Sequence, residues 1–89
     1  METEILEILQ KQGVMMSEKR VWIVEAICEA GFIKDVEDFW LDLRATRPIS
    51  WSTLHSTLRL MSMYGILERE NRGSKSISYR LIPLRDRGQ

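Results

Sequence analysis

The apolar residues of this 89-residue chain change their spacing after Gly65, and this change limits the folds that the chain can adopt. Before Gly65 they recur every three or four residues, which is the period of amphipathic helices. Between residues 76 and 81 they alternate instead, with Ile77, Tyr79 and Leu81 on one face. Such alternation predicts a β-strand. We therefore expect a mainly helical domain that ends in a small β-hairpin.

Four helices are expected, because residues typical of helix ends bound each apolar stripe. Ser17 and Asp35 are good N-caps, Ser50 or Ser52 caps the last helix, and Gly31 suits a left-handed C-terminus. The expected elements are helices at 2–12, 18–30, from 36 to before Pro48 and 50–64, a strand at 66–70, a turn at 71–75 and a strand at 76–81. Helices followed by a terminal hairpin predict a winged helix-turn-helix, with a three-helix core, an extra N-terminal helix and a C-terminal wing.

The length of the chain predicts one domain, with residues 1–83 forming the winged helix and 84–89 a flexible tail. One cysteine and one histidine cannot supply an internal disulfide or a tetrahedral Cys/His zinc site. The apolar runs are far shorter than the roughly 20 residues of a membrane helix, and the N-terminus does not resemble a signal peptide. We expect a cytoplasmic protein without metal, cofactor or small-molecule substrate. Nothing in the sequence supplies the groups of an enzyme active site.

The formal net charge is zero, but the charges are divided along the chain. Residues 1–47 contain ten acidic and six basic side chains, whereas residues 48–89 contain three acidic and seven basic ones. No carboxylate occurs from Leu43 to Leu67. A surface that binds phosphate must exclude carboxylates as well as supply cations. The C-terminal half is therefore the expected site of nucleic-acid binding.

The fourth helix is the expected DNA-recognition helix, since the second helix of a helix-turn-helix enters the major groove. The face opposite its core stripe carries Ser52, His55, Ser56, Arg59 and Met63. Serine hydroxyls can reach phosphates or base edges, and arginine can bind guanine or phosphate. Arg72 and Lys75, the cations at the tip of the hairpin, are candidates for contacts with the DNA backbone. Trp51, at the start of the fourth helix, is a further candidate.

Each of these residues also has a plain structural interpretation. Ser50 and Ser52 are more often caps than ligands, and a basic hairpin tip is often only a solvated turn. His55 can be an exposed histidine without a role. Cys28 is expected to be a small core residue, and the tryptophans are core residues by default. The case for DNA depends on the gathering of polar, non-acidic positions on one helix face.

Residues Ser17 to Leu81 resemble the DNA-binding domain of the ferric uptake regulator family of bacterial repressors. Ser17-Glu18-Lys19-Arg20 matches the family's Thr-x-x-Arg helix entry, and VEDFWLDL matches its acidic-aromatic helix. The turn and recognition helix correspond to ISWSTLHSTL and the later YGIL, and GSK and YRL fit the wing. The resemblance implies that four residues face DNA, with Arg20 as a backbone contact: Thr53, His55, Ser56 and Arg59.

The chain departs from this family in two respects. His55-Ser56 stands where the family has a DNA-contacting Tyr-Arg pair, which removes one cation from the groove. The family's metal-binding and dimerisation half has no counterpart here, so iron or zinc sensing is not expected.

Two functions remain open at this point. The first is a sequence-specific regulator that binds duplex DNA, as a homodimer because a monomer with so few cations would bind weakly. Ile5 and Leu9 of the first helix would either form the dimer contact or pack against their own domain. The alternative is a winged-helix protein–protein interaction module with little or no DNA binding, which net neutrality and Met63 favour.

Overall fold

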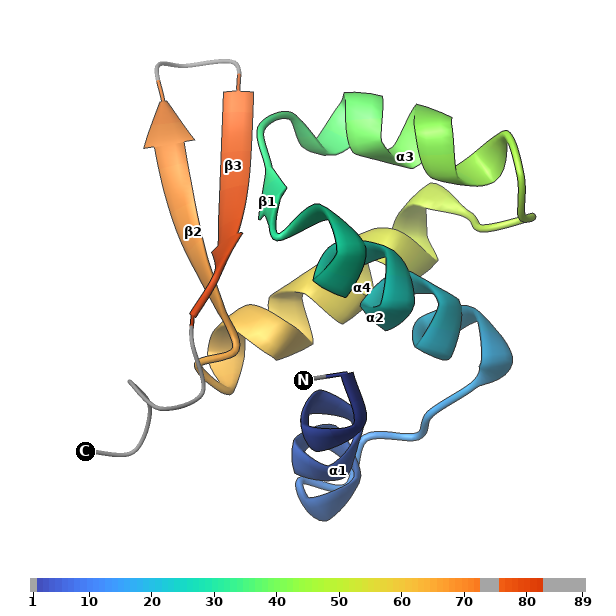
Figure 1. Ribbon diagram of the computed structural model, residues 1–89, viewed down its shortest axis with the longest axis vertical. Helices are drawn as coiled ribbons and strands as arrows, with labels where there is room; N and C mark the ends of the chain where they lie inside the picture. Colours follow the sequence, from blue (N-terminus) through green and yellow to red (C-terminus); the bar gives the residue numbers. More distant parts are fainter. Residues whose placement is uncertain (1, 73–75, 83–89) are drawn as a thin grey trace.

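A computed structural model describes residues 2–72 and 76–82, and in it the second, third and fourth helices pack against a small sheet while the first helix packs against the second (Figure 1). The elements in chain order are α1 (Glu2–Lys11), α2 (Glu18–Ala30), β1 (Phe32–Ile33), α3 (Val36–Arg44), α4 (Trp51–Met63), β2 (Leu67–Arg72) and β3 (Ser76–Leu81). This arrangement confirms the predicted winged helix-turn-helix. Within the described ranges, no helix combines the length and apolar character needed to cross a membrane.

The helices begin and end where their capping residues predict. Ser17 accepts a hydrogen bond from the backbone N–H of Arg20, and Asp35 accepts from those of Glu37 and Asp38. Gly31 follows α2 with φ of 73°, a left-handed conformation that costs a glycine little. Side-chain caps satisfy N–H groups that the first helical turn leaves without partners. Local sequence therefore determines both ends of α2 and the start of α3.

The three strands form an antiparallel sheet in the order β1-β3-β2. In the hairpin, Leu67 lies opposite Leu81 and the pairing continues to Arg72 opposite Ser76. On the other side of β3, Phe32 lies opposite Arg80. The short β1 thus joins the wing to the chain between α2 and α3, so the hairpin is tied to the helical core.

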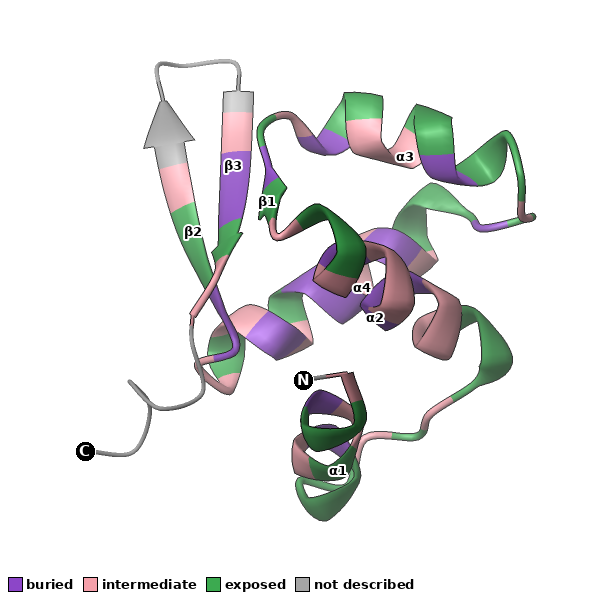
Figure 2. Ribbon diagram, in the orientation of Figure 1, coloured by how far each residue is buried: buried purple, intermediate pink, exposed green. Residues whose placement is uncertain are grey.

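The core lies between α2, α4 and the sheet (Figure 2). Both helices have a fully buried stripe, and β2 and β3 close one end of the core with Leu67 and Tyr79. The buried core residues of α2 and α4 are Ile23, Val24, Ile27, Leu54, Leu58 and Met61. Because α4 buries one side against this core, only its opposite side can meet a ligand.

α1 packs against its own domain through the residues that were candidates for a dimer contact. Ile5 is 0% and Leu9 is 1% exposed. Both belong to the same hydrophobic cluster as the core of α2. Of the two alternatives, the structure therefore favours packing within the domain, and a dimer contact would need another surface.

The structure corrects three details of the sequence prediction. β1 was not predicted, because two residues are too few to show alternation. β2 begins at Leu67 and runs to Arg72, so Asn71 and Arg72 belong to the strand and not to the predicted turn. α1 ends at Lys11, one residue early. Residues 73–75 of the predicted turn, and the predicted tail at 84–89, lie outside the described residues.

Candidate nucleic-acid interface

α4 has a buried side and an exposed side, as the helical pattern predicts. Leu54, Thr57, Leu58 and Met61 are buried. On the opposite side Ser52 and Arg59 are exposed, and the side chain of Met63 is 66% exposed. The exposed side of α4 therefore offers a hydroxyl, a guanidinium and a thioether to a ligand.

Ser50, and not Ser52, caps α4. The Ser50 hydroxyl accepts a hydrogen bond from the backbone N–H of Thr53 at 3.2 Å, and it lies 2.8 Å from the Thr53 hydroxyl. Ser52 Oγ is 3.4 Å from Ser50 Oγ and remains exposed. The Thr53 hydroxyl is thus engaged at the cap, and Ser52 is the more accessible hydroxyl of the first turn.

Arg20 and Ser56, both predicted to contact DNA, contact each other. Arg20 Nη2 donates to Ser56 Oγ at 3.1 Å, and Nη1 donates to the carbonyl oxygen of Met15 at 2.8 Å. Met15 itself is 80% exposed. One guanidinium therefore joins the segment before α2 to the middle of α4. Sequence reasoning placed Arg20 and Ser56 near the same ligand but did not reveal this bond, because it spans 36 positions.

The N-terminal end of α4 rests on a stack of aromatic rings. Trp51 packs edge-on against Trp40 of α3, with ring centroids 5.2 Å apart, and lies 4.3 Å from the ring of His55. Trp40 is fixed in turn, because its Nε1 donates to the carbonyl oxygen of Ile49 at 2.9 Å. Trp51 is nevertheless 40% exposed. Its ring therefore stays partly accessible beside the helix start, so Trp51 is not the core residue expected by default and has the exposure that the alternative, a backbone contact, requires.

His55 is less accessible than the helical pattern implies. The residue is half-buried, and its Nε2 atom is buried without a hydrogen-bond partner in the part of the chain that the structure describes. Together with Trp51, Asp35 and Glu37 it lines a small pocket of about 190 Å³ between the starts of α3 and α4. The carboxylates of Asp35 and Glu37 therefore lie next to α4, although neither residue belongs to that helix. The acid-free surface consequently ends at His55.

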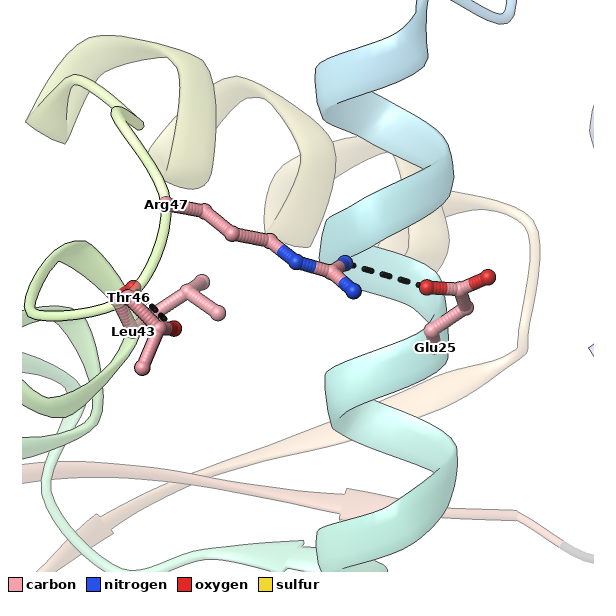
Figure 3. A network of polar contacts seen from close by, with 4 residues as sticks. All are labelled: Glu25, Leu43, Thr46 and Arg47. Carbon is pink, nitrogen blue, oxygen red and sulfur yellow. Dashed lines mark hydrogen bonds and ion pairs between the residues drawn. The ribbon is translucent and has the colours of Figure 1, made fainter.

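The turn between α3 and α4 is held against α2 by Arg47 (Figure 3). Its Nη1 donates to Glu25 Oε1 of α2 at 3.1 Å, and its guanidinium lies 5.1 Å from the centre of the Trp22 ring. In the same turn, Thr46 Oγ1 donates to the carbonyl oxygen of Leu43 at 3.1 Å. Arg47 therefore ties the turn that precedes α4 to the side of α2.

The predicted wing contacts are only partly placed. Arg72 ends β2, whereas Lys75 lies outside the described residues. Arg80 of β3 forms an ion pair with Glu68 of β2, so its charge is partly neutralised. Arg69, on β2, is exposed.

Two further expectations concern metals and the cysteine. In the described ranges, no three His, Cys, Asp or Glu side chains come together in a way that suits a metal ion. Cys28 is half-buried beside the core, and burial, with a smaller contribution from the negative charge of Glu2, raises the pKa of its thiol. A thiol of this kind has little nucleophilic character near neutral pH.

Comparison with known proteins agrees with the fold just described. A structure of a manganese uptake regulator superposes with a TM-score of 0.77 over 90% of this chain, at 25% sequence identity. A zinc-bound manganese uptake regulator gives 0.75 at 25% identity, and GAS PerR-Zn-Zn gives 0.79 at 17% identity, each over 90% of the chain. These neighbours are regulators of the ferric uptake regulator family.

The chain has the winged-helix fold of ferric uptake regulator N-terminal domains. No protein-family model and no curated protein sequence matches this chain. This chain spans 60% of the length of the manganese uptake regulator, 52% of that of PerR and 61% of that of the zinc-bound manganese uptake regulator. The expected resemblance is thus confirmed for the fold.

Proposed function

We propose that this protein is a transcription regulator that binds duplex DNA sequence-specifically, with the exposed side of α4 in the major groove. One observation carries the proposal: the exposed side of α4 presents Ser52 and Arg59 within a stretch, Leu43 to Leu67, that contains no carboxylate. Phosphate repels carboxylates strongly, so a long acid-free surface on the helix that this fold exposes favours a polyanionic ligand. The likeness to structures of metal-uptake regulators supports the same function.

The accessible residues of α4 have distinct roles in this proposal. Ser52, in the first turn, lies where recognition helices approach base edges or phosphates. Arg59, two turns further on, has the planar fork of donors that binds guanine or phosphate through two hydrogen bonds. Thr53, His55 and Trp51 line the helix start and contact the groove wall. Trp51 lies against a sugar, while Arg72 and Lys75 of the wing bind the backbone.

Arg20 acts as a backbone contact while it holds Ser56. A guanidinium has five N–H donors, and the bonds to Met15 and Ser56 use two of them. The remaining donors, at the start of α2 and next to the exposed side of α4, are available to a phosphate oxygen. In this arrangement Ser56 orients Arg20 and makes no separate contact with a base.

The small number of cations favours binding as a homodimer on a pseudo-palindromic site. Each phosphate contact contributes a limited gain from counterion release, and two subunits double the number of contacts. Because α1 uses Ile5 and Leu9 within its own domain, the dimer contact is expected elsewhere. We expect neither catalysis nor a cofactor, since the regulator acts by occupying DNA.

Gel retardation of duplexes selected from random sequence tests the proposal. Arg59→Glu is expected to abolish the shift, because it replaces a cation by an anion in the groove. Lys34→Glu makes the same change of charge at an exposed position that lines a pocket with Asp35, Asp38 and Asp42, where DNA would be repelled. Lys34→Glu is therefore the matched control and should retain the shift. If the folded, dimeric protein shifts no duplex at low salt, the proposal is wrong.

The second candidate function is a protein–protein interaction module. The exposure of Met63 on α4 and of Met15 beside Arg20 favours it, since methionine side chains on a surface suit adaptable protein contacts. The two functions differ in their dependence on salt, because burial of methionine is much less sensitive to ionic strength than phosphate binding. Association with a protein that Met63→Ser weakens, without any duplex binding, would favour this second function.

A further inference from the structure

Acidic residues that take no part in the DNA-binding proposal gather around α3. Two pockets flank this helix, one of about 520 Å³ beside β1 and β3 and one of about 430 Å³ beside α2. Phe39 and Asp42 line both. No lining residue of either pocket belongs to α4. The two pockets and α3 between them therefore form a separate surface, which we name the α3 face.

Large apolar groups are accessible on the α3 face. The side chain of Phe32 is 42% exposed on β1, and half-buried Phe39 reaches the pockets on both sides of α3. On the α2 side, Ala26 and Ala30 contribute small apolar side chains to the second pocket. Aromatic rings next to a hollow are typical of sites that receive an apolar side chain of a partner.

The rim of the α3 face is acidic. Asp38 and Asp42 are exposed on α3, and Glu29 is exposed at the end of α2. In the described part of the chain these three carboxylates form no ion pair, whereas Asp35 is engaged as the cap of α3. Among the described residues that line the two pockets, Lys34 is the one basic group. The surface therefore combines apolar hollows with an excess of negative over positive side chains.

We propose that the α3 face binds a basic amphipathic segment of a partner protein, with a large apolar side chain seated beside Phe32 and Phe39 and with Lys or Arg side chains paired to Asp38, Asp42 and Glu29. Complementary charge selects this occupant. Nucleic acid is excluded, because its phosphates would face the carboxylates. A second copy placed by two-fold symmetry is also disfavoured, because an isologous contact would set the same acidic rim against itself.

Fluorescence anisotropy with a labelled helical peptide of leucine and lysine, its leucines on one face, tests the proposal on the full chain without DNA. Asp38→Asn/Asp42→Asn is expected to weaken binding by about tenfold or more, because two ion pairs are lost. Glu7→Gln/Glu18→Gln removes the same charge from exposed positions on α1 and α2 that line neither pocket, and should change binding less than about twofold. Circular dichroism of each variant verifies that it is folded.

A second pair of variants separates a seated apolar side chain from general charge attraction. Phe32→Ser should weaken binding of the peptide, and the loss should persist at high salt, where ion pairs between exposed groups are screened. Leu41→Ser removes an exposed apolar side chain of α3 that lines neither pocket, so it should leave binding unchanged. Three results would each overturn the proposal. The first is an equal loss of peptide affinity from Asp38→Asn/Asp42→Asn and Glu7→Gln/Glu18→Gln, and the second is an equal loss from Phe32→Ser and Leu41→Ser. The third is no binding at peptide concentrations up to about 1 mM. None of these results bears on DNA binding, so the two proposals can fail separately.

Discussion

Arg20 on α2 donates through Nη2 to the hydroxyl oxygen of Ser56 on α4 at 3.1 Å, and so joins the two helices through residues that lie 36 positions apart in the sequence. The same guanidinium holds the carbonyl oxygen of Met15. Ser56 belongs to α4, and Arg20 lies next to the side of α4 that is proposed to face DNA. Their bond therefore holds α4 in place relative to the start of α2. The geometry of the interface therefore depends on a pair that neither helix defines alone.

A double-mutant cycle measures the strength of this pair. Arg20→Met keeps the aliphatic stem and removes the donors, while Ser56→Ala removes the acceptor. Urea denaturation of the two single variants and the double variant should give a coupling free energy of about 1.5 kcal/mol, the lower end of the range for a hydrogen bond to a charged group, because the pair is only partly buried. Strictly additive losses would mean that the contact contributes nothing to the free energy of unfolding.

The two serines at the start of α4 are expected to differ in their effect on stability. Ser50→Ala removes the N-cap and should lower the free energy of unfolding by about 1 kcal/mol. Ser52→Ala, two positions later and exposed, should change it by less than about 0.5 kcal/mol. Thermal or urea denaturation distinguishes the two variants. A larger loss of stability from Ser52→Ala than from Ser50→Ala would show that Ser50 is not the N-cap.

The two sides of α4 give a second matched comparison. Leu58 is fully buried, so Leu58→Ala should lower the free energy of unfolding by about 2–5 kcal/mol through lost burial and a cavity. Met63→Ala, on the exposed side of the same helix, should have an effect within about 0.5 kcal/mol. Similar losses from the two variants would contradict the orientation of α4.

Cys28 should react slowly with alkylating reagents in the folded protein. Burial, and secondarily the charge of Glu2, raises the pKa of the thiol, so the reactive thiolate is scarce at neutral pH. Since the unfolded thiol ionises first, at a pKa of about 8.5, stability should decline as the pH rises above that value. Iodoacetamide labelling should be slower in buffer than in urea at the same pH. Equal rates would show an exposed, ordinary thiol.

The sequence was sufficient for the helices, most of their caps and the presence of a terminal hairpin, because each depends on residues close together in the chain. Ser17, Asp35 and Ser50 cap as their positions predict, with Ser50 chosen over Ser52 only by the structure. The strand β1 was missed, since Phe32 and Ile33 become a strand only by pairing with Arg80 and Tyr79. Such pairing depends on tertiary structure and leaves no local periodicity.

The candidate site was predicted less completely than the fold. Helical geometry placed Ser52, Arg59 and Met63 on the exposed side correctly. It could not foresee that Trp51 would cover part of His55, because ring packing depends on side-chain conformation and on Trp40 from another helix. The charge count of the N-terminal half indicated an excess of acidic residues. It could not show that Asp38, Asp42 and Glu29 gather around the same pockets, because that depends on how α2 and α3 pack.

The salt dependence of binding to duplex DNA tests the central claim most directly. The logarithm of the association constant should fall linearly with the logarithm of salt concentration, with a slope of about −0.9 for each phosphate neutralised. We predict a slope steeper than about −2 for the wild-type protein, weaker binding at every salt concentration for Arg59→Ala, and an unchanged slope for Lys34→Ala. A folded protein that binds no duplex at low salt, or whose affinity is independent of both salt and Arg59, would contradict the account.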